Sequence, residues 1–216
     1  MPPNQSIITV LLADDHPTTR AGIRAILEKT PDIKVVGEAD NGNDVIRLVP
    51  ELGPQILLLD LQMPGPSPAK LEKWVRENYP ETITLILTAH DRDAYLTSMM
   101  DAGAAGFLAK TEKSENLIVA IRRAANGEIL FASEQLARAR RWREEAGNKY
   151  ASLTKRENEI LHLLADGLDN NAIAEQLNIS SKTIAFHITN VLKKLGVKSR
   201  HEAIAWLHNY MPYDLE

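Results

Sequence analysis

The sequence predicts an α/β domain, built on a doubly wound parallel five-stranded sheet, followed by an all-α domain of four helices. Strand-like and helix-like segments alternate five times before residue 126, with short connections that favour parallel strands. From residue 153 onward only helical periodicity remains. The clearest strand is Ile56 to Leu59, an unbroken apolar run between Pro54 and Pro64-Gly65, as expected for a strand buried on both faces.

Composition excludes several classes of protein. The chain has 216 residues, 44% of them hydrophobic, and no cysteine, so disulfides and thiolate chemistry are absent. No apolar run is long enough to cross a membrane, and the first six residues lack the features of a signal peptide. We therefore expect a cytoplasmic protein without membrane contacts. The net charge of −4 does not by itself indicate a nucleic-acid-binding protein.

The elements of the first domain follow from apolar spacing. Strands are expected at residues 7–12, 34–36, 56–59, 82–88 and 106–109, and helices at 18–28, 43–52, 69–78, 95–102 and 116–125. If the strand order is 2-1-3-4-5, the first and third strands are neighbours at the switch point, where such sheets bind ligands.

Polar residues follow the carboxyl ends of these strands. Asp14 and Asp15 follow the first strand, Asp60 the third, Thr88 ends the fourth, and Lys110 follows the fifth. Three carboxylates in one pocket need a counter-charge, and an oxygen-rich site suits Mg²⁺. Asp60 is then a candidate nucleophile towards a phosphoryl group. Mg²⁺ and Lys110 would neutralise the developing charge, and Thr88 would donate a hydrogen bond.

Each residue also has a simpler interpretation. The aspartate pair precedes Pro17 and is compatible with a helix cap. Lys110 alone would be a solvated lysine. His16 and His90 have no partners at metal-ligand spacing, so we interpret both as loop residues near the site. Asp60 is harder to explain structurally, because a buried strand end disfavours an unpaired carboxylate.

Residues 7–126 resemble a response-regulator receiver domain, which implies a CheY-like (flavodoxin-like) fold. The matching text is the aspartate pair, LLLDLQMPG, LILTAH and GAAGFLAK. The resemblance implies that Asp60 accepts a phosphoryl group from a sensor histidine kinase, assisted by the matched threonine and lysine. It also implies that Asp15, Asp60 and the Gln62 backbone carbonyl bind Mg²⁺, with Asp14 acting through water.

Two departures from the receiver pattern concern the signalling switch. Phe107 stands where the family usually has a switch tyrosine that acts with the residue matched by Thr88. Phenylalanine keeps the ring but lacks the hydroxyl. The loop MPGPSPAK also lacks a glycine that is frequent in the family, and its prolines indicate a stiffer loop.

The connection and the second domain have different patterns. Residues 127–149 break the α/β rhythm and predict a partly helical linker between a receiver at 1–126 and a DNA-binding domain at 150–216. In the second domain, Thr154 and Glu157 form a capping-box pattern. A short helix at 172–177, a turn and a longer helix at 181–195 predict a helix-turn-helix.

The polar face of the helix at 181–195 indicates DNA binding. No acidic residue lies between Glu175 and Glu202, and phosphate attraction depends on local charge. A solvated lysine face would not explain Phe186, whose ring could contact a thymine methyl group. The candidate DNA contacts are Lys182, Thr183, Ala185, Phe186, Thr189, Lys193 and Lys194.

Residues 153–207 resemble a LuxR-type DNA-binding domain, so the whole chain resembles a NarL/FixJ-type response regulator. The matching text is LTKRENEILHLLADG, IAEQL, ISSKTIAFH and KKLGVKSR. Family members often carry basic residues where Ala185, Thr189 and Asn171 stand, so the family's base preference does not transfer. The resemblance also implies a homodimer when active, and we expect Ile204 and Leu207 to supply the dimer contact.

The sequence therefore predicts a phosphorylation-controlled transcription factor that binds double-stranded DNA. It is not expected to be an enzyme beyond its own phosphotransfer and autodephosphorylation. One alternative is an aspartyl-phosphate phosphatase, although Gln62 stands where that chemistry needs a second carboxylate. Another is a receiver that binds a partner without using phosphate, which the complete acidic pocket disfavours.

Overall fold

The computed structural model describes residues 7–89 and 91–210, without the side chains of residues 145 and 208–210. His90 lies outside the described residues, so its expected place near the site is untested. The chain forms two compact units. Residues 7–89, 91 and 95–136 belong to the first, and residues 92–94 and 137–210 belong to the second. In the described part of the chain, no helix is long and apolar enough to span a membrane.

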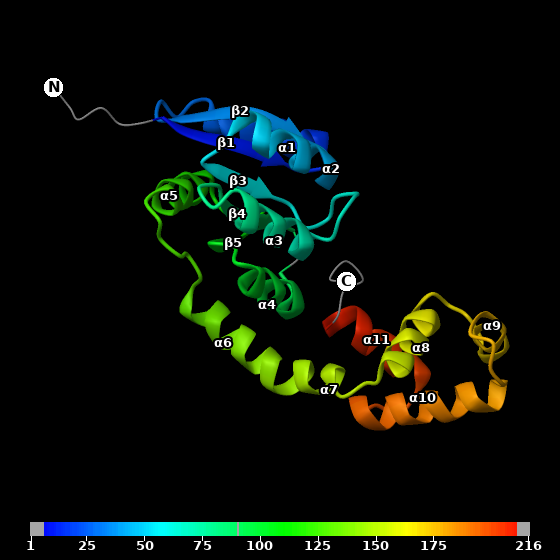
Figure 1. The fold of residues 1–216 in the computed structure, drawn as a ribbon. Helices are drawn as coiled ribbons and strands as arrows, with labels where there is room; N and C mark the ends of the chain where they lie inside the picture. The colour runs from blue at the N-terminus through cyan, green and yellow to red at the C-terminus, as the bar shows by residue number, and fades with distance from the viewer. Residues whose placement is uncertain (1–6, 90, 211–216) are drawn as a thin grey trace. The chain divides into compact units, whose positions relative to one another are not determined.

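The first unit contains a five-stranded parallel sheet in the order β2-β1-β3-β4-β5, as predicted (Figure 1). The strands are β1 (Ile8–Ala13), β2 (Ile33–Ala39), β3 (Ile56–Leu59), β4 (Ile83–Thr88) and β5 (Gly106–Ala109). All four residues of β3 are fully buried, as its apolar run predicts. This order places β1 beside β3, so their carboxyl ends are adjacent.

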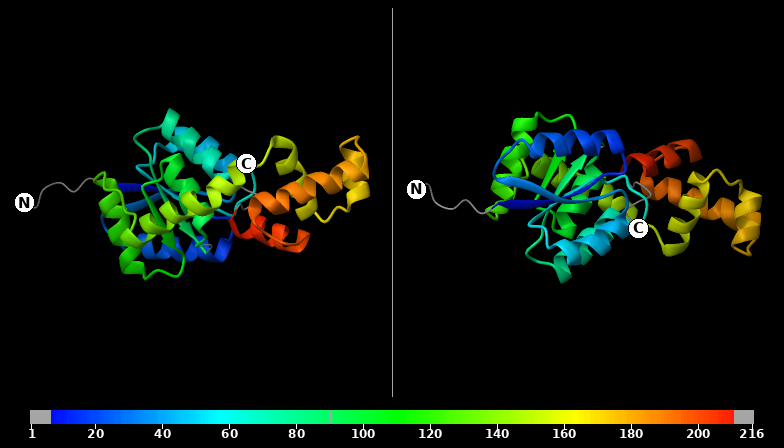
Figure 2. Two further views of the ribbon diagram at one scale, coloured as in Figure 1. Left: turned by 90° about the horizontal axis from the view of Figure 1, so that it is seen from below. Right: turned by 90° about the horizontal axis from the view of Figure 1, so that it is seen from above.

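Helices cover both faces of the sheet (Figure 2). They are α1 (Pro17–Leu27), α2 (Gly42–Leu52), α3 (Pro68–Asn78), α4 (Asp93–Ala102) and α5 (Ser114–Ala125). One apolar core joins α1 and α5 to the sheet, and the other joins α2, α3 and α4. Every expected helix of this unit is present.

Strand β2 is longer than its sequence pattern predicts. Its pairing with β1 continues to Ala39, with a register shift between Val10 and Leu11. The Asp14 amide then donates to the Ala39 carbonyl across 3.0 Å. Pairing with a central strand therefore extends β2 through Gly37-Glu38, which local propensity does not favour.

The second unit is helical throughout its described part. Helix α6 (Ser133–Trp142) begins in the first unit and continues into the second from residue 137. The other helices of the second unit are α7 (Asn148–Ala151), α8 (Lys155–Ala165), α9 (Asn170–Gln176), α10 (Ser181–Leu195) and α11 (Arg200–Tyr210), and a π-helical turn at Arg143–Gly147 joins α6 to α7. The predicted capping box is present, because Thr154 Oγ1 accepts from the Glu157 amide and the Glu157 carboxylate accepts from the Thr154 amide. Helix α10 has the predicted bounds.

The predicted linker contains helix, as expected, in α6 and in the π-helical turn that follows it. The Leu130 amide donates to the Ala105 carbonyl across 2.6 Å, and Phe131 packs against a core of the first unit. Further along, Trp142 and Ala146 pack into a core of the second unit. Both ends of this segment therefore contribute side chains to hydrophobic cores, whereas Ile129 and Leu136 remain exposed.

Candidate functional site

The predicted receiver pocket forms where the strands end. Backbone hydrogen bonds fix its frame: the Asp60 amide donates to the Ala13 carbonyl across 2.9 Å, and the Lys110 amide donates to the Thr88 carbonyl across 2.8 Å. These bonds continue the parallel pairing one residue beyond the strands. The polar side chains that follow β1, β3 and β5 are thereby brought together, as predicted.

Lys110 bridges two buried carboxylates. Its Nζ atom lies 2.7 Å from Asp60 Oδ2 and 2.9 Å from Asp14 Oδ2. Asp60 is 3% exposed and Asp14 is 1% exposed, so both carboxylates are removed from bulk water. Burial opposes the charge on Lys110, but the hydrogen bonds that its ammonium donates to both carboxylates, together with their negative charge, outweigh burial and raise the lysine pKa. The ammonium is therefore held charged beside Asp60.

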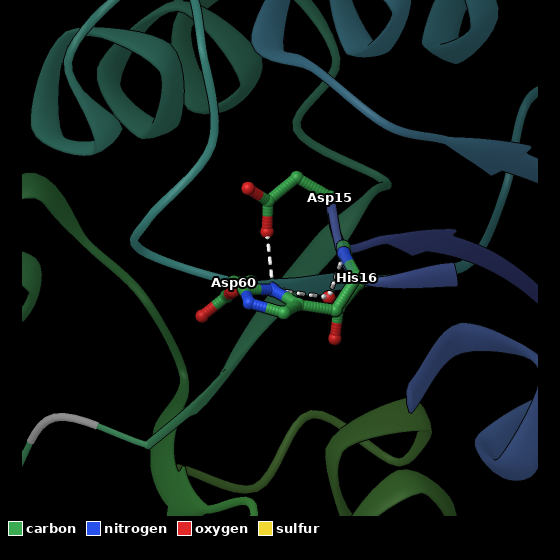
Figure 3. Close-up of side chains that lie close together, drawn as sticks. Asp15, His16 and Asp60 are labelled. Atoms are coloured by element: carbon green, nitrogen blue, oxygen red, sulfur yellow. Dashed lines mark hydrogen bonds and ion pairs between the residues drawn. The ribbon is translucent and has the colours of Figure 1, made fainter. Parts of the chain in front are cut away.

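Asp15 and His16 complete a cluster around Asp60 (Figure 3). His16 Nδ1 lies 2.6 Å from Asp15 Oδ1, and one ligand atom each from Asp14, Asp15, His16 and Asp60 all lie within 4.8 Å of one another. This acidic cluster could hold a metal ion. The expectation that His16 is a loop residue near the site is confirmed, and its ring reaches the same carboxylates although its sequence spacing gave no sign of metal-ligand partners.

The aspartate pair does not cap helix α1. The N-cap position of α1 is His16, and it makes no side-chain capping hydrogen bond. Asp14 Oδ1 instead accepts from the His16 amide across 2.8 Å, ahead of the helix. The helix-cap interpretation of the pair is thus not supported, and both carboxylates belong to the pocket.

A cavity of about 170 Å³ gives access to Asp60. Its lining includes Gln62, Ala89 and Lys110. Within the pocket, Asp60 Oδ1 accepts from the Leu61 amide across 2.8 Å, while Oδ2 accepts from Lys110. Both oxygens are therefore oriented by donors, and the cavity leaves space for a group of phosphoryl size.

The two candidate switch residues lie on neighbouring strands. Thr88 is fully buried at the end of β4, directly before Ala89 in the cavity lining. Phe107 in β5 is 3% exposed, and its ring is part of the core beneath α2, α3 and α4. The Phe107 carbonyl accepts from Gln135 Nε2 across 2.8 Å. In this structure the ring is thus turned inward.

Helix α10 presents the predicted polar face to solvent. Ile184, Val191 and Leu195 are buried on its other side. Phe186 is 63% exposed, which is unusual for a phenylalanine on a folded domain. The other exposed candidates on this face are Lys182, Ala185, Thr189 and Lys193, and Thr183 is half-buried.

The two lysines at the end of α10 have different surroundings. Lys193 is exposed, whereas Lys194 is half-buried. Lys194 Nζ donates to Glu157 Oε2 across 2.6 Å and to the Ser152 carbonyl across 2.8 Å. Its ammonium therefore ties α10 to the start of α8, an internal role that the sequence analysis did not foresee.

Comparisons with known proteins identify both parts of the chain. The family "Response regulator receiver domain" matches residues 10–122, and "Bacterial regulatory proteins, luxR family" matches residues 151–207. The transcriptional regulatory protein LiaR of Bacillus subtilis is 40% identical over 94% of this chain and 97% of its own length. The chain is a NarL/FixJ-type response regulator. It therefore regulates transcription and is not a conventional enzyme.

Other relatives agree with this assignment. The nitrate/nitrite response regulator protein NarL of Escherichia coli K12 is 38% identical to this response regulator, over 95% of this chain and 97% of NarL. A structure of the response regulator RcsB in complex with DNA has a TM-score of 0.63 at 28% identity, covering 94% of this chain and 99% of RcsB. This regulator thus shares its fold, and its class of DNA-binding response regulator, with these proteins along nearly the whole chain.

The expected dimer contact of the regulator needs correction. Leu207 is fully buried in a core of the second unit, and Ile204 is half-buried against the other core. The two residues therefore do not form an exposed apolar patch. Their helical spacing is as typical of a stripe that faces the core as of an exposed patch. Because α11 packs against α8 and α10, the two residues face the core.

Two functional features were missed at the sequence level. His16 had a signal, since it directly follows the aspartate pair. The partnership of Lys194 with Glu157 had none, because the two residues are 37 positions apart and meet only after α8 packs on α10. Sequence spacing shows which residues share a helix face, but it does not show which face the next helix covers.

Proposed function

We propose that Asp60 of this regulator accepts a phosphoryl group from the phosphohistidine of a sensor kinase. An Asp60 oxygen attacks phosphorus, a P–O bond forms, and the P–N bond to the donor breaks. Lys110 holds the aspartate in place beforehand and then neutralises phosphoryl oxygen charge. The Thr88 hydroxyl donates to a phosphoryl oxygen. Phe107 is the switch residue, whose ring changes position when Thr88 makes this hydrogen bond. The observation that carries the proposal is the lysine-held carboxylate facing a cavity.

The residues of the pocket fit Mg²⁺. Asp15, Asp60 and the Gln62 backbone carbonyl would bind the ion directly, and Asp14 would act through water, because its carboxylate already faces Lys110. The ion supplies positive charge that offsets the charge on phosphate and carboxylates. His16 is a poorer ligand for this hard cation than oxygen, so we assign it no direct bond to the ion.

The output of the regulator is sequence-specific binding of double-stranded DNA. We assign the receiver to residues 1–126, the linker to 127–149 and the DNA-binding domain to 150–216. Exposed Lys182 and Lys193 contact phosphates, while Ala185, Phe186 and Thr189 face the bases. A homodimer is the active form, supported by relatives that include RcsB dimers bound to DNA. Because its target is chromosomal DNA, we place the regulator in the cytoplasm.

The phosphoacceptor is tested with acetyl phosphate and Mg²⁺. We expect the protein to gain the mass of one phosphoryl group, in an acyl phosphate that hydroxylamine or alkali removes. Asp60→Asn should abolish the gain while circular dichroism shows an intact fold. Asp32→Asn is a matched control, because Asp32 is paired with Arg122 away from the pocket. Full labelling of Asp60→Asn would place the nucleophile elsewhere.

A further inference from the structure

The backbone of Asp14 is held on both sides of the residue. Its amide donates to the Ala39 carbonyl across 3.0 Å, and its carboxylate accepts from the His16 amide across 2.8 Å. Its carbonyl oxygen accepts from Nη1 of Arg20 in α1, across 2.5 Å. This last bond joins a helix side chain to the connection between β1 and the pocket, although Arg20 itself does not line the cavity at Asp60.

Arg20 reaches the carbonyl because of its place at the start of α1. Its amide donates to the His16 carbonyl across 3.0 Å, so it lies one turn into the helix. Side chains on a helix point back towards the helix N-terminus. The guanidinium is therefore directed at the connection from β1 to α1, and the Arg20 side chain is only 17% exposed there.

A carboxylate on the neighbouring strand orients this guanidinium. Nε of Arg20 donates to Oε2 of Glu38 in β2 across 2.9 Å, while Nη1 donates to the Asp14 carbonyl. Hydrogen bonds from Arg24 and from Arg20 outweigh burial and lower the pKa of Glu38, so the carboxylate is charged at neutral pH. Because a guanidinium is rigid and planar, a partner that holds one of its edges also determines where the other edge points.

The Asp14 carbonyl belongs to the peptide group that leads to Asp15. A peptide group is planar, so a bond to its oxygen restrains the whole plane, and with it the Cα atom of Asp15. The Asp15 carboxylate has weaker support of its own. Its Oδ1 atom lies 2.6 Å from the exposed His16 ring and accepts no hydrogen bond among the described residues. The backbone therefore largely determines where this carboxylate lies.

We propose that Arg20 is a positioning residue for the metal site of the pocket. By bonding the Asp14 carbonyl, Arg20 holds the peptide that carries Asp15, and it thereby raises the affinity of the pocket for Mg²⁺. The inference rests on the proposed function, in which Asp15 binds the ion directly. Groups that orient metal ligands typically contribute about 10–100-fold to metal affinity.

Arg24 provides a comparison within the same helix. It lies one turn after Arg20 and also bonds Glu38, but its other partner is Glu28 of the same helical segment. In the described part of the chain, its hydrogen bonds therefore join α1 to β2 without reaching a residue of the pocket. If the Arg20 ion pair only joined the helix to the sheet, loss of either arginine would have the same effect on the metal site.

Mg²⁺ titration of the ¹⁵N-labelled full-length protein tests this role, with the Asp15 amide signal as the readout. Arg20→Met should weaken Mg²⁺ binding by about 10-fold. Loss of a cation near the pocket would by itself strengthen Mg²⁺ binding, so the sign of the change separates positioning from simple electrostatics. Arg24→Met is the matched control. It loses the same charge and a bond to the same Glu38, and it should not weaken Mg²⁺ binding.

The inference is overturned if Mg²⁺ affinity in Arg20→Met is unchanged, is raised, or falls no more than in Arg24→Met. If Arg20→Met does not fold, two variants that keep the charge decide. Arg20→Lys lacks the planar fork and should bind Mg²⁺ at least about threefold more weakly than the unmodified protein, whereas Arg24→Lys should not. Equal affinity in Arg20→Lys and the unmodified protein would overturn the inference. Absence of Mg²⁺ binding by the unmodified protein would instead refute the metal site of the proposed function, and the role of Arg20 with it.

Discussion

At the scale of single residues, buried carboxyl groups that lie beside a cation differ from a buried carboxyl group that forms no ion pair among the described residues. Asp60 and Asp14 are both buried, and both lie within ion-pair distance of the Lys110 ammonium. Glu72 is equally buried, and among the described residues no cation forms an ion pair with it, although the charge of Arg76 is near. Burial therefore raises the pKa of the Glu72 carboxyl group, which binds a proton more readily than an ordinary glutamate.

The proton on Glu72 predicts a pH-dependent stability. Its pKa is about 7 in the folded protein against 4.5 ordinarily, so the folded state binds more protons between these values. Stability contributed by this group is therefore complete below about pH 4.5 and is lost as pH rises through 7. Glu72→Gln should remove the effect, worth up to about 3 kcal/mol. Urea unfolding of both proteins at pH 5 and pH 8 measures it, and equal pH dependence of the two proteins would contradict it.

Neighbouring lysines at the end of α10 are expected to differ in function. Lys193→Ala should lower the slope of DNA affinity against salt by about one unit, because one phosphate contact is lost. Lys194→Ala should instead reduce the free energy of unfolding by about 1 kcal/mol, since the Glu157 and Ser152 contacts disappear. Salt-titrated binding and urea unfolding of both variants provide the test. A larger change in salt slope for Lys194→Ala would reverse the assignment.

At the scale of elements, periodicity predicted most of what is observed. The buried run of β3 and the apolar stripe of α10 were located with correct bounds, because short-range spacing determines both. The length of β2 depends on pairing with β1, and the second half of the linker depends on packing of Trp142. Long-range contacts of this kind leave no periodic signal. The burial of Leu207 was missed for the same reason.

The exposed face of α10 carries a prediction about specificity. Phe186→Ala should relax discrimination at one or two base pairs and leave the salt dependence of DNA affinity unchanged, because a ring touches bases and not phosphates. Binding to a library of single-base operator variants measures the effect. Lys193→Ala serves as the control that changes salt dependence alone. If both variants altered base preference alike, α10 would not lie in the major groove as proposed.

At the scale of the whole molecule, Asp60, the proposed phosphoacceptor, and α10, the proposed DNA-binding helix, belong to different compact units. Control of one by the other requires two arrangements of the chain that phosphate favours unequally. The receiver therefore regulates DNA binding only through a coupling free energy, which in proteins is typically about 1–3 kcal/mol. The observable quantity is the ratio of DNA affinities with and without phosphate.

Phosphorylation should raise operator affinity by roughly 5–150-fold, the range that such a coupling gives. A fragment starting at residue 137 should bind without phosphate, because it lacks the receiver but keeps Trp142 and Ala146 for its core. Electrophoretic mobility shifts compare the full chain, with and without acetyl phosphate, to this fragment. Asp60→Asn is the unphosphorylated control. Equal affinity in all samples would mean that the receiver does not gate DNA binding.

The π-helical turn at Arg143–Gly147 determines how side chains before it are rotated, around the helix axis, relative to side chains after it. Trp142, Ala146 and Tyr150 follow one another at intervals of four and all pack in the same core. In a regular α-helix, residues spaced by four drift by about 40° around the axis. The wider turn takes up part of this drift. Loss of one residue here would leave a helix but rotate Trp142 by about 100° relative to Tyr150. Natural relatives should therefore tolerate substitutions in this turn more readily than changes in its length.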